Sequence, residues 1–122
     1  ADCQLEIEFS GRSSTMNHNR TIAERWLANA RAYGIEDQGP DPSVGSTDMG
    51  NVSWKVPAIH PDLAIAPPGT PGHSVSFRDA AVSPQADATT LLAATLIAQT
   101  AYDLLADPAL VAAAWREFRG EG

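Results

Sequence analysis

Two pairs of residues, Ser83-Pro84 and Asp107-Pro108, constrain the fold of this chain more than any other feature. Serine and aspartate accept hydrogen bonds from the free N–H groups at a helix start, and proline suits the first helical turn because it has no N–H to satisfy. An Ala- and Leu-rich stretch runs from the first pair to Leu105, and an apolar stripe follows the second pair. The sequence therefore predicts two consecutive C-terminal helices, the last of which ends at Gly120.

The N-terminal part of the chain has the pattern of a strand followed by a helix. Apolar and polar residues alternate over residues 4–9, which predicts a half-buried strand. Its apolar positions are Leu5, Ile7 and Phe9. Apolar residues at helical spacing then predict a helix over residues 20–33, with Asn19 as its N-cap and Gly34 as a left-handed stop.

A stretch rich in Gly, Pro, Asp and Ser occupies residues 36–51 and is typical of a connection or a domain boundary. Beyond it, residues 52–59 have the pattern of a strand, with Pro57 near an edge or the strand's end, and residues 63–66 that of another short strand. A loop rich in Pro and Gly then leads to His73. Together these elements predict an α/β fold with a strand–helix unit, one or two further strands and two C-terminal helices.

The composition excludes several classes of protein. The 122 residues are 43% hydrophobic, which suits one globular domain. A net charge of −7 argues against binding to nucleic acid or to an anionic membrane surface, and no apolar run reaches the roughly 18 residues that span a bilayer. Cys3 is the single cysteine, which rules out a disulfide within the chain and favours a cytoplasmic location. Its place in the alternating pattern predicts a small buried side chain rather than a nucleophile.

Two loops carry residue types that suit ligand binding. His73 lies in an irregular loop, but a metal site needs three or four ligands, and the sequence has no HxH, HExxH or CxxC pattern. A structural or solvated histidine fits the same residues. Asp48 lies among small residues that let backbone amides approach a ligand, although a tight turn in which Asp48 bonds its own backbone fits equally. His18 lies between two asparagines in a polar loop, where a solvated side chain is the default interpretation.

Three short motifs, in order along the chain, resemble the C-terminal active-site half of M20-type metallopeptidases (amidohydrolases). In that family a Gly-(Ser/Thr)-x-Asp segment precedes a strand, and a histidine in a later loop binds metal. The motifs here are Gly45-Ser46-Thr47-Asp48-Met49-Gly50-Asn51, Val56-Pro57-Ala58-Ile59-His60-Pro61 and Gly72-His73-Ser74. They look most like the branch that acts on aminoacyl or p-aminobenzoyl-glutamate amides. The auxin-conjugate branch usually has Glu-Asp at Thr47-Asp48, so this chain departs from that branch.

The resemblance implies a role for several residues and a division of the chain. His73 would be a metal ligand, and Asp48 would shape the loop beside the metal ions or contact the substrate. His18 and Asn19 would approach the substrate from a lid, often across a dimer. The implied parts are residues 1–35 as the end of the lid or dimerisation domain, residues 36–51 as the connection and Gly-rich loop, and residues 52–122 as the C-terminal part of the catalytic domain.

The implied reaction is hydrolysis of an N-acyl amino acid or dipeptide-like amide by two divalent metal ions, most often zinc, that share a bridging water. A glutamate takes the proton from that water. That glutamate and the remaining metal ligands have no counterpart in these residues, so we expect the chain to be inactive alone. The start Ala-Asp-Cys-Gln, without an initiator methionine, is typical of a piece of a longer protein or of a processed one.

We expect the complete enzyme to be a homo-oligomer. Its expected substrate is a small amide, and we expect it to bind neither nucleic acid nor a membrane. The alternative is a non-catalytic, small acidic α/β module that associates with itself or with another chain. An exposed apolar surface would drive association in either case, so an oligomer alone does not distinguish the two functions.

Overall fold

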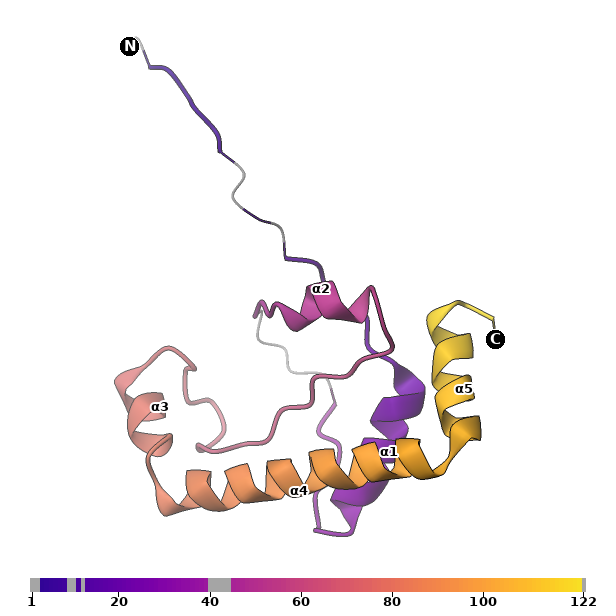
Figure 1. The fold of residues 1–122 in the computed structure, drawn as a ribbon. Coiled ribbons are helices and arrows are strands. Elements are labelled where there is room, and N and C mark those ends of the chain that lie inside the picture. Colours follow the sequence, from indigo (N-terminus) through magenta and orange to yellow (C-terminus); the bar gives the residue numbers. More distant parts are fainter. Residues whose placement is uncertain (1–2, 9–10, 12, 40–44, 122) are drawn as a thin grey trace.

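A computed structural model describes residues 3–8, 11, 13–39 and 45–121 of the chain. The described residues form three longer helices and two short ones. In chain order they are α1 (Arg20–Arg31), α2 (Met49–Ser53), α3 (Val75–Ala80), α4 (Pro84–Ala106) and α5 (Pro108–Phe118). The long α4 runs along one side of the molecule, α1 crosses it, and α5 turns back from its end (Figure 1). Helices α1, α4 and α5 contact one another and form the centre of the fold.

The predicted helix starts are confirmed. The Ser83 hydroxyl accepts a hydrogen bond from the N–H of Ala86 at 3.2 Å, and Pro84 occupies the first turn of α4. The Asp107 carboxylate accepts from the N–H of Ala109 at 2.9 Å and so caps α5. Gly34 and Gly120, which follow α1 and α5, have φ angles of +75° and +70°, so each supplies the left-handed stop expected of it.

The predicted α/β class is wrong, because the described residues contain no strand. The nearest approach to a sheet is a single parallel bridge between His18 and Ala58. Residues 3–8 are extended and exposed, and the side chains of Leu5 and Ile7 are 85% and 63% accessible to solvent. Alternating residues form a strand only where a neighbouring strand takes up their N–H and C=O groups, and these residues have no such neighbour. Phe9, the last apolar position of that pattern, lies outside the described residues.

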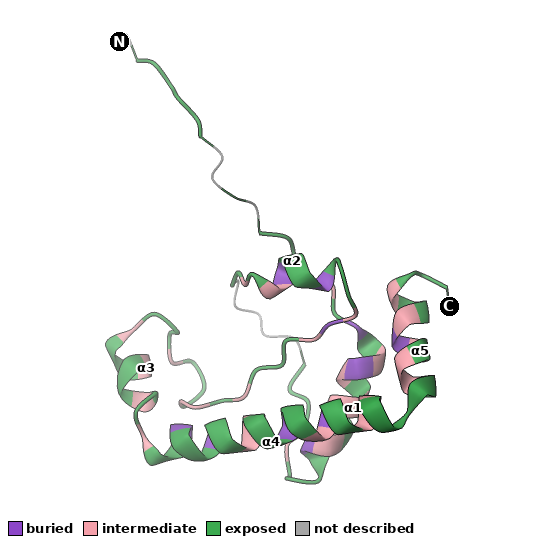
Figure 2. Ribbon diagram, viewed as in Figure 1, coloured by how far each residue is buried: buried purple, intermediate pink, exposed green. Residues whose placement is uncertain are grey.

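Cys3 lies in the same extended segment, and its side chain is exposed. The predicted burial of this residue is therefore wrong, for the same reason that the strand is wrong. Burial of a strand's apolar side needs a second layer to cover it. In Figure 2 residues 3–8 are drawn as an exposed trace away from the helices, so none of the described helices covers them.

The strands predicted for residues 52–59 and 63–66 are also not found. Val52 and Ser53 end α2, and the N–H groups of Lys55 and Val56 turn back to the carbonyl of Val52 at 2.8 and 3.2 Å. These backbone hydrogen bonds make a turn where the strand pattern requires an extended chain. Only residues around Ala58 are extended against another segment, and Pro57 has no N–H for a ladder.

The centre of the fold is small and includes close contacts through alanine. Ala30 of α1 and Leu96 of α4 are completely buried, and Ala114 of α5 is 2% exposed. Alanine at these positions lets the helix backbones approach each other. Figure 2 shows buried positions on the inner faces of α1, α4 and α5 and mostly exposed ones on the outer face of α4. Among the described residues, no helix is both long and apolar enough to cross a membrane.

Candidate functional site

The residues expected at a functional site lie at the starts of helices. Asp48 directly precedes α2, and its exposed carboxylate makes no capping hydrogen bond. His73 lies in an exposed turn before α3, where the Ser74 hydroxyl accepts from the N–H of Phe77 at 3.1 Å and caps that helix. His18 is exposed and Asn19 buried, immediately before α1. The short helices α2 and α3 were not predicted, although Ser74 is a typical N-cap residue.

The small residues around Asp48 serve the packing of one chain segment on another. The hydroxyl of Ser53, which is completely buried, accepts from the N–H of Asn17 at 2.9 Å and donates to the carbonyl of Gly50 at 2.7 Å. A Cβ atom on Gly50 would overlap the carbonyl oxygen of Ser14. Gly50 is therefore required where residues 14–17 cross α2. Its small size serves this packing between two chain segments, whereas the sequence pattern alone also suggests room for a ligand.

Asn19 links three parts of the fold, and its amide is bonded within it. The side chain is 3% exposed; its oxygen accepts from the N–H of Ile22 at 3.1 Å, and its nitrogen donates to the carbonyl of Ala114 at 3.0 Å. Its backbone N–H donates to the carbonyl of Ala58 at 2.9 Å. Asn19 thereby caps α1 as predicted and also fixes α1 to α5 and to the segment before Pro61.

Glu117 of α5 is a second cap of α1 that the sequence did not reveal. Its carboxylate accepts from the N–H of Arg20 at 2.6 Å, and from the N–H and hydroxyl of Thr21 at 2.8 and 2.6 Å. Partial desolvation acts to raise the pKa of Glu117, but these hydrogen bonds outweigh it, so the pKa lies below its ordinary value. No local pattern could have revealed this cap, because Thr21 and Glu117 are 96 positions apart in the sequence.

A polar network joins the other end of α1 to α4. Asp103 forms an ion pair with Arg25 at 2.6 Å and accepts from the amide of Asn29 at 2.9 Å. The same amide donates to the buried hydroxyl of Thr100 at 3.2 Å. Hydrogen bonds from Arg25 and Asn29 hold the pKa of Asp103 below its ordinary value, and the hydrogen bond to Asp103 raises that of Arg25. The network fixes the position of α1 along α4.

The described residues do not by themselves make a metal site. No group of three or more His, Cys, Asp or Glu side chains is placed to hold an ion in that part of the chain. The surface around His73 is an open depression that includes Phe77 and Arg78, and Arg78 forms an ion pair with its neighbour Asp79 at 2.6 Å. A single imidazole does not fit the requirement for three or four ligands. Asp48, His18 and His73 therefore do not combine into such a group.

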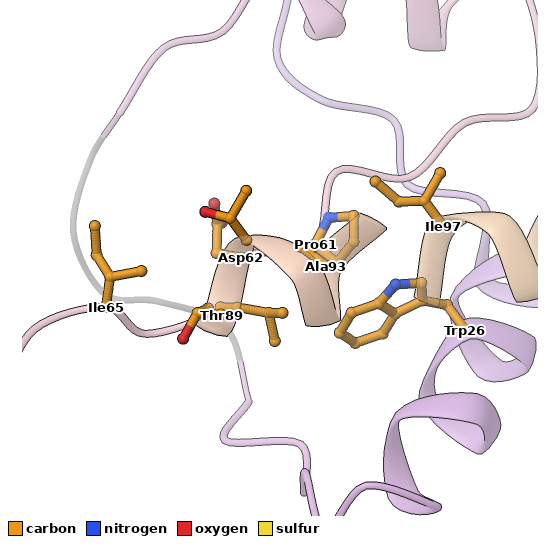
Figure 3. A pocket seen from close by; sticks show the side chains of 9 residues that line it. Trp26, Pro61, Asp62, Ile65, Thr89, Ala93 and Ile97 are labelled. Atoms are coloured by element: carbon orange, nitrogen blue, oxygen red, sulfur yellow. The ribbon is translucent and has the colours of Figure 1, made fainter. Parts of the chain in front are cut away.

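A better-defined hollow lies between α1, residues 61–65 and α4, and the sequence did not reveal it. Its volume is about 200 Å³. Figure 3 shows the Trp26 indole toward one end and Ile65 toward the other. The lining residues are Trp26, Pro61, Asp62, Leu63, Ile65, Thr89, Thr90, Ala93 and Ile97. The available signal was Trp26, a large aromatic on the predicted helix, but its partners come from distant parts of the chain.

Comparisons with known proteins point to one kind of relative. The chain is 37% identical over 122 residues to a mouse (Mus musculus) protein named Xaa-Arg dipeptidase. It is 34% identical over 123 residues to the human (Homo sapiens) protein of the same name. Each match covers 96% of this chain and 28% of the relative. No family model matches the chain, and no solved structure does.

The chain spans little more than a quarter of the length of these relatives and matches their C-terminal part. The order of the motifs around Asp48 and His73 had indicated a C-terminal portion of an M20-type enzyme, and these relatives confirm that resemblance. Over nearly all of its length, this chain is homologous to the C-terminal part of peptidases of the M20 family.

Proposed function

We propose that this chain acts as the C-terminal part of a metal-dependent dipeptidase that cleaves dipeptides with a C-terminal arginine. The observation that carries the proposal is identity of 37% and 34%, over 96% of the chain, to two proteins named Xaa-Arg dipeptidase. The broader class inferred from the motifs, N-acyl amino acids and dipeptide-like amides, includes such substrates. A dipeptide is itself an amino acid acylated on nitrogen.

In this proposal His73 provides one ligand to a site with two divalent ions, for which zinc is the first candidate. Its exposure in a turn supports the role, because an accessible imidazole can reach a shared ion without rearrangement of the helices. The remaining ligands would come from outside this segment, since the described residues do not supply them. When bound, such ions activate water and polarise the scissile carbonyl.

We propose that Asp48 and His18 contact the substrate, which their exposure permits. Asn19 has a different part. Its amide oxygen and nitrogen bond to Ile22 and Ala114, so in this proposal Asn19 positions its neighbour His18 rather than meeting the substrate directly. The division into residues 1–35, 36–51 and 52–122 belongs to the same proposal. Because α1 packs on α4 and α5, the first and last of these parts share a core in this chain.

An association role is the second candidate, and one surface favours it. Leu91, Tyr102 and Leu105 of α4 are 72%, 71% and 85% exposed. Side chains of this size and exposure on one helix are typical of a surface that another chain covers. A homo-oligomer would use this surface with or without catalysis.

A cytoplasmic location is also proposed, from the single free cysteine, Cys3.

The proposal is tested by release of free arginine from Xaa-Arg dipeptides by the complete polypeptide that carries this segment. The assay is run as purified, after chelation, and after addition of zinc, manganese or cobalt. We expect release that chelation abolishes and one of the metals restores, and no release by the 122-residue chain alone. A complete polypeptide that releases no arginine under any of these conditions would contradict the proposal and favour the association role.

A further inference from the structure

We propose that the hollow between α1, residues 61–65 and α4 is the subsite for the guanidinium side chain of the substrate's C-terminal arginine. The inference rests on the proposed dipeptidase function and adds the place and chemistry of side-chain recognition. The hollow is separate from the open depression at His73, with which it shares no lining residue. A recognition site for the side chain can therefore be tested independently of the metal-binding role of His73.

The size of the hollow suits a side chain and not a whole substrate. Its volume of about 200 Å³ is several times the share of one water molecule, ~30 Å³. It is also below the ~300–1,000 Å³ of pockets that enclose a drug-sized ligand. Leu63, Ala93 and Ile97 form apolar walls. These walls suit the three methylene groups of an arginine side chain, which pack well on apolar surface while the charged end stays partly hydrated.

The charge of the hollow favours a cation. Asp62 is the one ionisable side chain in its lining, which contains no lysine, arginine or histidine. The Asp62 carboxylate is exposed and forms no ion pair within the described part of the chain. A guanidinium can pair with both oxygens of such a carboxylate. The Trp26 indole lies toward one end of the hollow (Figure 3), and an indole is the aromatic ring that cations bind best.

Hydrogen bonds hold the walls of the hollow in place before any ligand arrives. Arg25, next to Trp26, is tied to Asp103 of α4 at 2.6 Å, and Asn29 of α1 is tied to the same carboxylate at 2.9 Å. On the opposite wall, the Asn19 N–H holds the carbonyl of Ala58 at 2.9 Å, three residues before Pro61. A subsite with positioned walls loses less entropy on binding.

The test uses the 122-residue chain and two probes that the enzyme cannot cleave as dipeptides. N-acetyl-arginine N-methylamide carries the cation, and the citrulline analogue has nearly the same shape without the charge. Amide and indole N–H shifts are followed by NMR during titration. We expect the arginine probe to shift the Trp26 indole and the amides of Asp62 and Ala93, and the citrulline probe to bind several-fold more weakly.

The variant Asp62→Asn removes the charge with almost no change of shape. Because an exposed ion pair contributes little, we expect its affinity for the arginine probe to fall by roughly 2- to 5-fold. Glu6→Gln is the matched control, since it removes one negative charge from the extended N-terminal segment (Figure 1) and should leave affinity unchanged. Equal binding of both probes, shifts outside the hollow only, or equal affinity in Asp62→Asn would overturn the subsite.

The outcome is distinguishable from failure of the dipeptidase proposal, because binding to the chain and hydrolysis by the complete polypeptide are measured separately. In the complete polypeptide, Asp62→Asn should raise KM for an Xaa-Arg dipeptide and leave KM for an Xaa-Leu dipeptide unchanged. If the Asp62→Asn polypeptide releases arginine with an unchanged KM, the dipeptidase proposal stands and the proposal of an arginine subsite is rejected. Selective probe binding without any hydrolysis would keep a cation site and reject its role in catalysis.

Discussion

The carboxylate of Glu117 accepts a hydrogen bond from the Thr21 hydroxyl at 2.6 Å and so joins the last helix of the chain to the start of the first long one. The same carboxylate accepts from the N–H of Arg20 and of Thr21. It also places a negative charge at the positive end of the α1 dipole. The N-terminus of α1, which follows His18, is therefore positioned by α5.

Replacement of Glu117 by Gln should destabilise the chain by about 1 kcal/mol, because charged hydrogen bonds at a helix start are lost on a largely exposed surface. Urea unfolding followed by circular dichroism measures the change. Glu121→Gln is the control, since the Glu121 side chain forms an exposed ion pair with its near neighbour Arg119, which contributes little to stability. Equal effects of the two substitutions would show that the Glu117 cap at the start of α1 contributes nothing to stability.

Acid should weaken this fold through Glu117 and Asp103. Both carboxyls have pKa values below their ordinary values of 4.5 and 3.8. The stability they contribute is fully present above those ordinary values and is lost as the pH falls through the lowered pKa of each folded-state group. Unfolding free energies measured from pH 6 down to pH 2–3 should therefore decline, and should decline less steeply in Glu117→Gln and in Asp103→Asn. An unchanged pH dependence in both variants would contradict the assignment.

Gly50→Ala should disrupt the crossing of residues 14–17 over α2, because the new Cβ overlaps the Ser14 carbonyl. We expect a loss of roughly 1–3 kcal/mol, the usual cost of overpacking. The backbone N–H of Asn17 should also lose its hydrogen bond to the Ser53 hydroxyl. Hydrogen exchange of that N–H, followed by NMR, measures this loss. Gly45→Ala is the control, since a Cβ there meets no atom within 4 Å. A Gly50→Ala protein as stable as Gly45→Ala would show that the two segments do not pack this closely.

Asn19→Ala should cost about 2 kcal/mol, because it removes the cap of α1 and the hydrogen bond from the Asn19 amide to the carbonyl of Ala114. His18→Ala, one residue earlier, should change stability little, since the His18 side chain is exposed. Thermal unfolding of both variants tests the difference. The pair also separates the structural part of Asn19 from the substrate contact proposed for His18. A destabilised His18→Ala protein with Asn19→Ala unaffected would reverse the assignment.

The sequence was sufficient where structure depends on neighbours along the chain. Ser83-Pro84, Asp107-Pro108 and Asn19 each cap the helix that directly follows, so the patterns predicted α4, α5 and α1 correctly. The alternation at Leu5 and Ile7 failed because a strand needs a partner that local pattern does not supply. Nor could one sequence show that Gly50 meets Ser14, since that contact joins segments far apart in the chain.

The candidate site was predictable only in part, and for a similar reason. The motifs around Asp48 and His73 were sufficient to indicate the M20 family, which the dipeptidase relatives confirm. The roles of the individual residues remain predictions. The hollow at Trp26 and Asp62 has no motif at all, because its walls come from three separate segments.

The measurement that tests the metallopeptidase proposal most directly is the effect of His73→Ala on the complete polypeptide. Metal content per chain by mass spectrometry and arginine release are measured together. His60→Ala is the matched control. His60 is also an exposed histidine, but it lines neither the hollow nor the open depression at His73. We predict that His73→Ala loses bound metal and nearly all turnover while His60→Ala keeps both. Unchanged metal content and turnover in His73→Ala would contradict its role as a ligand.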